Sequence, residues 1–405
     1  MTAAVLHPND LAGEAFFRDP YPTYRAWRER GRIFRVDILG GIWFVPHYRG
    51  LTDLLRDERL SHNTSRYWAG QFGAEKLAVL DPFISVFSQW MALFDGHPHA
   101  RYRKLLNKAF HGASREFRGA IEGTVHGLLD RVQDKGRMDV IGDFAYPLPA
   151  IIITRLLGLP GEDVPRITEC ADHLVNLFGA THETYSLALK AQESLLWLTD
   201  YLEGVISERK SKPGKDLISL LVQAEEDGDR LSPMEINAQC SMMLFAGHET
   251  TRNLIGNGLL ALLSHPGQLA ALNEHPMLMK DAVEEMVRYD SPVQLTVRAA
   301  LEDIVYEGET VRKGELVMFG YGSANHDPDY FRDPDRFDIR RADNKHLGFG
   351  VGAHICTGIN LAKVEAMTAL TAILARMPGI RLEHADPDWH HNAGFRGLKS
   401  LPVVF

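Results

Sequence analysis

One stretch of the chain, residues 232–264, limits the fold more than any other feature. Ser232 can cap a helix, Pro233 suits the first helical position, and Glu235 completes a capping box. No further proline follows until Pro266, so the predicted helix exceeds thirty residues, which is unusually long for a globular protein. A helix that is apolar on most sides must run through the interior. The sequence therefore predicts a mainly helical protein built around one long central helix.

The rest of the chain adds further helices and a smaller strand-rich part. Apolar periodicity and turn residues predict helices over 277–289 and 358–377, and short strands over 33–36, 41–45, 293–297, 304–306, 316–319 and 401–405. No linker-like or repetitive segment interrupts the 405 residues. We therefore expect a single domain over 1–405, mainly α with a minor β part, and no fused reductase.

Charge and composition exclude several classes of protein. The formal net charge is −9, from 44 Lys and Arg against 53 Asp and Glu, and nucleic-acid binding would need a basic face. The sequence contains no signal-peptide pattern and no apolar stretch long enough for a membrane span. The three cysteines, Cys170, Cys240 and Cys356, fit neither a disulfide framework nor a zinc motif. We expect a soluble, cytoplasmic protein that binds neither nucleic acid nor membrane.

The most informative segment is the glycine-rich stretch 349–358, which reads Phe-Gly-Val-Gly-Ala-His-Ile-Cys-Thr-Gly. Its glycines allow tight turns and the close approach of another group. Cys356 lies at the start of the helix predicted over 358–377, where the helix dipole and backbone N–H groups favour a thiolate. A thiolate at this place can be a metal ligand or a nucleophile, and these residues alone leave both functions open.

This segment resembles the haem-binding signature of the cytochrome P-450 family, Phe-Gly-x-Gly-x-His-x-Cys-x-Gly, at every fixed position. The resemblance implies the fold of that family, haem b as cofactor, and Cys356 as the axial ligand of the iron, which favours O–O cleavage. It also implies that Phe349 packs near the sulfur, that Gly350 helps to hold the haem, and that His354 bonds a haem propionate. One departure is Lys363, where the family usually has arginine.

A second motif lies inside the long helix. Ala246, Gly247, Glu249 and Thr250 resemble the family's Ala-Gly-x-acid-Thr oxygen-activation motif. The resemblance implies that Thr250 donates a hydrogen bond to dioxygen, while Glu249 relays protons from solvent. Such an acid–alcohol pair favours the use of dioxygen and two electrons over hydrogen peroxide. Without the resemblance, a kinked core helix with a solvated Glu–His pair explains the same residues equally well.

Four basic residues match positions that bind the haem propionates in the family. His99 and Arg103 are four residues apart and therefore share one helix face. Arg298 follows in a predicted strand, and His354 belongs to the cysteine segment. Buried carboxylates need Arg and His partners, so the resemblance implies a propionate cradle of these four side chains.

Glu285 and Arg288 stand three residues apart on a predicted helix, a spacing typical of weak surface ion pairs. The family instead has a buried Glu-x-x-Arg at this place, joined by an arginine from a later Pro-x-Arg-Phe segment. Here that arginine is Arg336. The resemblance therefore implies a structural network of Glu285, Arg288 and Arg336, without a catalytic role.

The resemblance also implies a mostly apolar substrate cavity. Its expected lining residues, each of which could equally be plain core, are Phe87, Trp90, Met242, Phe245, Val293, Gln294, Thr296 and Phe395. The expected substrate is a hydrophobic small molecule, and fatty acids, terpenoids, polyketides and aromatic natural products of secondary metabolism all remain open.

The electrons are expected ultimately from NAD(P)H, through a separate ferredoxin reductase and ferredoxin. We expect an acidic ferredoxin to dock on a group of cations formed by Arg101, Lys104, Lys108, Lys345 and Lys363.

Two other classes of protein compete with an oxygenase. One is a non-enzymatic haem-thiolate sensor or carrier, but a sensor does not need the proton-delivering pair of Glu249 and Thr250. The other is a cysteine hydrolase with Cys356 as nucleophile, which would need a nearby base. The nearest histidine, His354, already belongs to the haem signature. Within the oxygenases, hydroxylation is not separated from epoxidation, desaturation or oxidative coupling.

Overall fold

The computed structural model describes residues 11–38, 41–65, 72–114, 117–180, 184–226 and 228–405. The chain divides into two compact units, which we treat separately. The mixed unit comprises Met1–Ser61, Leu129–Ala145 and Thr250–Phe405, and the helical unit comprises His62–Leu128 and Tyr146–Glu249. The single domain expected from the sequence stays a prediction. Within the described ranges, every helix is too short or too polar to cross a bilayer.

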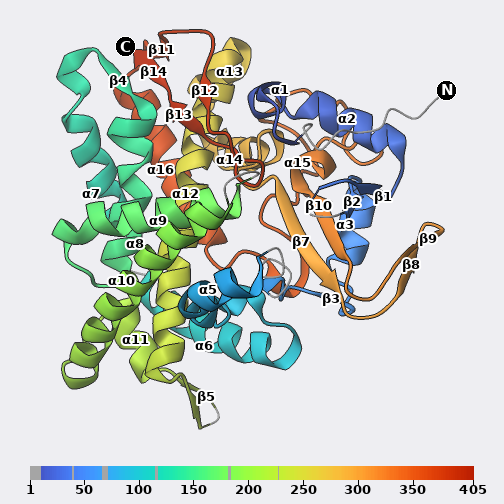
Figure 1. The fold of residues 1–405 in the computed structure, drawn as a ribbon. Coiled ribbons are helices and arrows are strands. Elements are labelled where there is room, and N and C mark those ends of the chain that lie inside the picture. The colour runs from blue at the N-terminus through green and yellow to red at the C-terminus, as the bar shows by residue number, and fades with distance from the viewer. Residues whose placement is uncertain (1–10, 39–40, 66–71, 115–116, 181–183, 227) are drawn as a thin grey trace. The chain divides into compact units, whose positions relative to one another are not determined.

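The mixed unit contains a five-stranded sheet in the order β1-β2-β10-β7-β3. The strands are β1 Phe34–Val36, β2 Ile42–Val45, β10 Leu316–Gly320, β7 Leu295–Ala300 and β3 Leu60–Ser61. β2 and β10 run parallel, and the other neighbours run antiparallel. In Figure 1 the blue N-terminal strands lie beside the orange strands of the last third of the chain. This sheet therefore joins segments that are far apart in the sequence.

The other elements of the mixed unit are mostly helices and short strand pairs. The helices are α1 Glu14–Arg18, α2 Tyr21–Arg30, α3 Tyr48–Leu54, α13 Pro266–Glu274, α14 Met279–Tyr289, α15 Tyr321–Ala324 and α16 Ile359–Arg376, with the short turns η3 Gln133–Lys135, η4 Val140–Ala145, η6 Pro276–Leu278 and η7 Gly352–His354. The additional strands are β4 Arg137–Asp139, β8 Ile304–Tyr306, β9 Glu309–Val311, β11 Arg381–Leu382, β12 Asp388–Trp389, β13 Leu398–Ser400 and β14 Pro402–Val404.

Both faces of the five-stranded sheet are buried. Successive side chains of a strand point to opposite faces. Phe44 and Met318 accordingly join one apolar cluster, in which Trp27 of α2 packs edge-on against Phe44 with ring centroids 4.5 Å apart. Val45 and Phe319, the next residues along β2 and β10, join a second cluster with residues of α3 and α15. The sheet is therefore a buried platform from which β7 and β10 lead to the candidate site.

The helical unit is built from helices, with one short strand pair. Its elements are α5 Ala74–Phe87, η2 Met91–Leu93, α6 Gly96–Ser114, α7 Phe117–Asp130, α8 Pro147–Leu156, η5 Gly161–Asp163, α9 Val164–Phe178, α10 Thr184–Ser211, α11 Leu217–Gln223, β5 Glu225–Glu226 and β6 Asp229–Arg230. The fold is thus mainly helical with small sheets, as the sequence predicted.

The long helix α12, Pro233–Ser264, is formed as predicted. The capping box at its start is present: the Ser232 N–H donates to the Glu235 carboxylate at 2.6 Å, and the Glu235 N–H donates to the Ser232 hydroxyl at 3.3 Å. Most residues from 236 to 262 are buried. The boundary between the two units falls inside this helix, between Glu249 and Thr250.

A buried carboxylate, that of Glu285 on α14, ties several segments of the mixed unit together. Arg288, one turn later, donates to it at 2.7 and 2.8 Å, and both side chains are fully buried. Arg341 approaches both carboxylate oxygens at 3.2 Å. The Asp338 N–H and the Asn344 amide add two more hydrogen bonds, at 2.9 and 3.1 Å. Glu285 and Arg288 therefore form a buried network and not a surface ion pair.

The expectation that the Arg336 guanidinium completes this network is wrong. Its side chain is 64% exposed and comes only within 4.0 Å of Asp338. Arg336 takes part through its carbonyl oxygen, which accepts hydrogen bonds from Arg288 at 3.0 Å and from Arg341 at 2.8 Å. Arg341 supplies the second cation because the preceding loop turns back and offers the carbonyls of residues 332, 333 and 336 to its guanidinium.

We predict that Arg341→Ala lowers the free energy of unfolding by roughly 3 kcal/mol, because it leaves a buried carboxylate with one cation fewer. Arg336→Ala should change it by less than about 0.5 kcal/mol, since the carbonyl oxygen is retained and the lost side chain is exposed. Urea unfolding of the two variants beside the parent protein measures both effects. Equal destabilisation by the two substitutions would contradict the assignment of the second cation to Arg341.

Candidate functional site

The cysteine loop, residues 349–358, lies in the mixed unit and is shaped by its own backbone. Gly350 and Gly352 adopt φ angles of +75° and +81°, in the left-handed region that favours glycine. The Gly350 N–H donates to the Leu347 carbonyl at 2.8 Å. Across the loop, the Cys356 N–H donates to the Phe349 carbonyl at 2.9 Å. The loop therefore binds Phe349 and Cys356 to each other before α16 begins.

The three cysteines differ in their surroundings. Cys170 and Cys240 are fully buried, and burial raises the pKa of both thiols. Both are therefore held as neutral, unreactive thiols. Cys356 is only half-buried. A side chain at Gly358 would just touch its sulfur, at 4.0 Å. Of the three cysteines, Cys356 alone is not fully buried.

Arg298 of β7 is 7% exposed and is oriented by its own strand. Its guanidinium donates to the Thr296 hydroxyl and to the Val297 carbonyl, both at 2.8 Å. The Tyr321 hydroxyl also interacts with Arg298, which lowers the pKa of this tyrosine, although burial raises that pKa more strongly. A side chain at Gly350 would meet the same hydroxyl at 3.6 Å. Tyr321 thus connects Arg298 with the cysteine loop, a role for which the sequence held no signal.

The other predicted propionate partners lie on two different elements. His354 ends the short turn η7 of the mixed unit and is half-buried. His99 and Arg103 share one face of α6 in the helical unit, as their spacing predicted. Burial lowers the pKa of His99, and the neighbouring Arg103 cation lowers it further. His99 is therefore favoured in its neutral form.

The middle of α12 is more open than its ends. Ala246 is exposed, and Phe245, Gly247 and Thr250 are half-buried, although the helix is buried on either side of them. A side chain at Gly247 would meet Ile153 at 3.4 Å, so glycine allows α8 to pack closely here. The small residues at 246 and 247 thus leave an accessible strip of helix surface beside Thr250. Glu249 itself is buried, with 3% exposure.

Four predicted cavity residues lie in the helical unit, and three of them form an aromatic cluster. The Trp90 ring lies 5.1 Å from Phe87 and 5.5 Å from Phe245, measured between ring centroids. Phe178, which sequence reasoning did not single out, lies 5.0 Å from Phe87 and 5.4 Å from Phe245. Met242 is buried on the same helix as Phe245. This region therefore presents large apolar side chains, as an apolar cavity needs.

The other four predicted cavity residues lie in the mixed unit. Val293 and Phe395 form an isolated antiparallel bridge and are half-buried. Thr296 orients Arg298 through its hydroxyl. Gln294 is 2% exposed and donates to the Ser291 carbonyl at 2.7 Å, which places its amide in the core of the unit. That Gln294 lines a substrate cavity stays a prediction.

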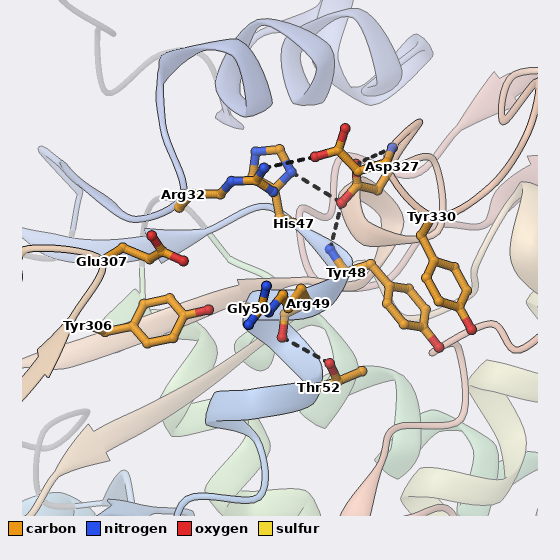
Figure 2. Close-up of a pocket in the computed structure, with 11 residues that line it drawn as sticks. Arg32, His47, Tyr48, Arg49, Gly50, Thr52, Tyr306, Glu307, Asp327 and Tyr330 are labelled. Atoms are coloured by element: carbon orange, nitrogen blue, oxygen red, sulfur yellow. Dashed lines mark hydrogen bonds and ion pairs between the residues drawn. The ribbon is translucent and has the colours of Figure 1, made fainter.

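A surface hollow of about 540 Å³ in the mixed unit offers a different set of groups (Figure 2). Among the described residues, its His47, Asp327 and Asp329 form the one cluster with the composition of a metal site. Both ring nitrogens of His47 are already engaged, with Asp327 and with the Arg28 carbonyl, each at 3.1 Å. Asp329 pairs with Arg32 at 2.9 Å. These bonds to one another and to Arg28 and Arg32 engage all three residues, and we interpret the cluster as structural.

One buried acid was missed by sequence reasoning. Glu365 lies on α16, nine residues after Cys356, and is 3% exposed. Its Oε2 atom has no hydrogen-bond partner in the described structure, and burial raises the pKa of its carboxyl to about 8. A periodic pattern places this position on the inner face of a helix. A glutamate, however, is usually exposed to solvent, so the sequence did not predict that Glu365 is buried.

Comparison with known proteins places the chain in a family. The family model described as Cytochrome P450 matches residues 76–275 and 268–378. The chain is 39% identical to a biotin biosynthesis cytochrome P450 of Bacillus subtilis, over 98% of this chain and 99% of that protein. It is 35% identical to the polyketide biosynthesis cytochrome P450 PksS of the same organism, over 100% and 99%.

Solved structures agree with this result. The structure of P450BioI in complex with hexadec-9Z-enoic acid ligated acyl carrier protein matches with a TM-score of 0.90 and 37% identity, over 96% of this chain and 99% of that chain. A myxobacterial cytochrome P450, CYP267B1, in complex with myristic acid matches with a TM-score of 0.87 and 36% identity, over 98% and 99%. The chain belongs to the cytochrome P450 family, and the predicted fold class is confirmed. It is therefore a monooxygenase that uses haem and dioxygen.

We predict that the contribution of Glu365 to the stability of the protein falls as pH rises from about 5 to 8, because folded Glu365 keeps its proton to a higher pH than its ordinary pKa of 4.5 allows. The stabilisation by protonated Glu365 is complete below 4.5 and is lost as pH passes through about 8. Glu365→Gln should remove up to about 1.4 kcal/mol of this loss per pH unit.

Denaturant unfolding at pH 5, 6.5 and 8 measures how the free energy of unfolding of each variant changes with pH. Glu203→Gln, on the exposed side of α10, is the control and should keep the parent slope. A Glu365→Gln variant with the parent slope would contradict the prediction.

Proposed function

We propose that the chain is a haem-thiolate monooxygenase in which Cys356 is the axial ligand of haem b. The observation that carries the proposal is the cysteine loop. Its two left-handed glycines and the bond from the Cys356 N–H to the Phe349 carbonyl present a half-buried sulfur, whereas the other two thiols are buried. Such a loop fits a flat cofactor close to the sulfur. When bound, the haem supplies the iron at which dioxygen is reduced.

In this proposal His99, Arg103, Arg298 and His354 hold the two haem propionates. Arg298 supports the assignment because its guanidinium is already oriented by Thr296 and by a backbone carbonyl. A buried, pre-oriented guanidinium is a strong partner for a carboxylate. His99, favoured as a neutral imidazole, can donate one hydrogen bond without bringing a second charge beside Arg103.

Thr250 and Glu249 are proposed to deliver protons to dioxygen. The accessible strip at Ala246 and Gly247 supports this role, because a small ligand needs room beside the helix to reach the Thr250 hydroxyl. Thr250 would donate the hydrogen bond, and Glu249 would pass protons to it from solvent. Phe349, packed at the sulfur, would shield the thiolate from water.

The proposed substrate is a hydrophobic molecule with a long aliphatic chain, a fatty acid or a fatty acyl group. The aromatic cluster around Trp90 supports an apolar cavity. Two structural relatives are described with such molecules: one with hexadec-9Z-enoic acid on an acyl carrier protein, the other with myristic acid. Relatives in biotin and polyketide biosynthesis favour a role in secondary or cofactor metabolism.

We further propose that the protein acts in the cytoplasm and receives electrons from NAD(P)H through ferredoxin reductase and ferredoxin. Not all of the cations expected at the docking surface remain suitable. Arg101 is held by Asp229 at 2.5 Å and by Glu235 at 2.8 Å, and its side chain is 23% exposed. Lys104 and Lys108 are more accessible on the same helix and remain the better docking residues.

The test of the haem-thiolate proposal is a spectrum. The purified protein, reduced and treated with carbon monoxide, should show the red-shifted Soret band of thiolate-ligated haem. Cys356→Ser should lose this band while keeping the fold, as judged by circular dichroism. Cys170→Ser serves as the matched control and should keep the band. A colourless parent protein, or a Cys356→Ser variant with the band intact, would sink the proposal.

The proton-delivery role is tested by the coupling of electron use to product. With myristic acid as substrate, and with ferredoxin, reductase and NADPH, the parent protein should form hydroxylated acid. In Thr250→Ala the yield of product per NADPH should fall at least about tenfold, with the electrons released as hydrogen peroxide, because the hydroxyl that guides the proton is lost. Thr251→Ala, the neighbouring substitution, is the control. Thr250→Ala with fully coupled turnover would argue against the role.

A further inference from the structure

Behind the cysteine loop, two side chains of the mixed unit bind one carboxylate and form a compact network with it. Lys363 of α16 pairs with Glu284 of α14 at 2.6 Å, between Nζ and Oε1. His346 lies at 3.0 Å from the other oxygen of Glu284, through Nε2. The Gly348 N–H donates to Nδ1 of His346 at 3.2 Å, so the proton of the neutral ring is on Nε2. His346 therefore donates to Glu284.

The charges of this network are defined. Burial raises the pKa of Glu284, but the hydrogen bonds from His346 and Lys363 outweigh it, and the net pKa is lowered. Glu284 is thus favoured as a carboxylate. Both side chains are only about one-fifth exposed, at 22% and 23%. Lys363 is therefore held inside the protein and is a poor docking residue for ferredoxin, contrary to the expectation from the sequence.

The network touches the cysteine loop through one ring. The Lys363 ammonium lies 5.1 Å from the centroid of the Phe349 ring, within the range of a cation–π interaction. The His346 ring lies 5.7 Å from the same centroid. The Phe349 carbonyl in turn accepts the hydrogen bond of the Cys356 N–H. An ion pair on α14 and α16 is thus connected to the sulfur through a single residue.

We propose that the Lys363–Glu284 ion pair sets the reduction potential of the haem bound by Cys356. This inference rests on the haem-thiolate function proposed above. Reduction adds one negative charge to the haem, and a nearby cation stabilises the reduced form while a nearby anion destabilises it. Lys363 and Glu284 therefore act in opposite directions. The Glu284 carboxylate and the Phe349 ring hold the cation on the side of the cysteine loop, and Lys363 acts on the haem at a distance, through this position.

The experiment is a spectroelectrochemical titration of the haem-loaded protein and its variants. Lys363→Met removes the cation and leaves the carboxylate, so the ratio of reduced to oxidised haem at a fixed potential should fall about tenfold, which is about 59 mV for one electron. Glu284→Gln leaves the cation without its anion, so the ratio should rise. The double variant should return towards the parent value. Lys363→Arg, the residue usual in the family, should preserve the parent potential.

Lys280 provides a matched control. It lines the same hollow of about 310 Å³ as Glu284 and Lys363, but it is exposed. Lys280→Met should therefore shift the ratio much less than Lys363→Met. A mere loss of packing would move Lys363→Met and Glu284→Gln in the same direction, whereas the proposal requires opposite directions.

The outcomes separate this inference from the proposed function. If the parent and both variants keep the thiolate band with carbon monoxide but share one potential, the ion pair has no role and the haem-thiolate function stands. The ion pair is likewise excluded if both variants shift in one direction, or if Lys280→Met shifts as far as Lys363→Met. If the parent protein lacks the thiolate band, the proposed function itself is overturned, and the inference with it.

Discussion

The structure of the mixed unit depends on one buried carboxylate, that of Glu285. A charge with no exposure is tolerated only because two guanidinium groups and two further donors surround it. From there the bonds continue to the cysteine loop. Arg288 donates to the Asn325 carbonyl, and the Asn325 amide oxygen accepts the Leu347 N–H. The Leu347 carbonyl then accepts the first N–H of the glycine turn. Through this chain of hydrogen bonds, the position of the cysteine loop and its sulfur depends on α14.

Helix α14 also carries a second carboxylate, that of Glu284, which is connected to the cysteine loop through Lys363 and the Phe349 ring. Glu285 is fully buried and holds the segment 338–344 through its hydrogen bonds. Its neighbour Glu284 is partly exposed and forms an ion pair with Lys363. Adjacent residues on a helix point about 100° apart, so one helix can serve both tasks. A network that holds the loop and a network that adjusts its electrostatics are therefore separable by mutation, although they begin one residue apart.

Much of the fold and of the candidate site could be predicted from local sequence. The capping box at Ser232 and Glu235 and the length of α12 were readable, because both depend on residues near in the sequence. The glycines of the cysteine loop could be predicted for the same reason. The partners of long-range contacts could not be predicted from the sequence. Arg336 sits in the expected motif, yet Arg341 reaches Glu285, since the turn between them decides which side chain faces inward. Phe178 and Tyr321 carried no pattern, and their roles come only from what they contact.

The sequence by itself determined the class of the protein, because the glycines, histidine and cysteine of the loop stand at short fixed spacings that resemble the signature of a known family. It also determined the family to which the chain belongs and the helical character of its centre. Only the tertiary structure decided the state of individual charges: that Glu365 is buried with a raised pKa, that Lys363 is paired with Glu284, and that Arg101 is bound by acids. The physical reason is that solvation and Coulomb interactions depend on distance in space. A carboxylate and an ammonium about 80 residues apart have no common signal until the fold brings them together.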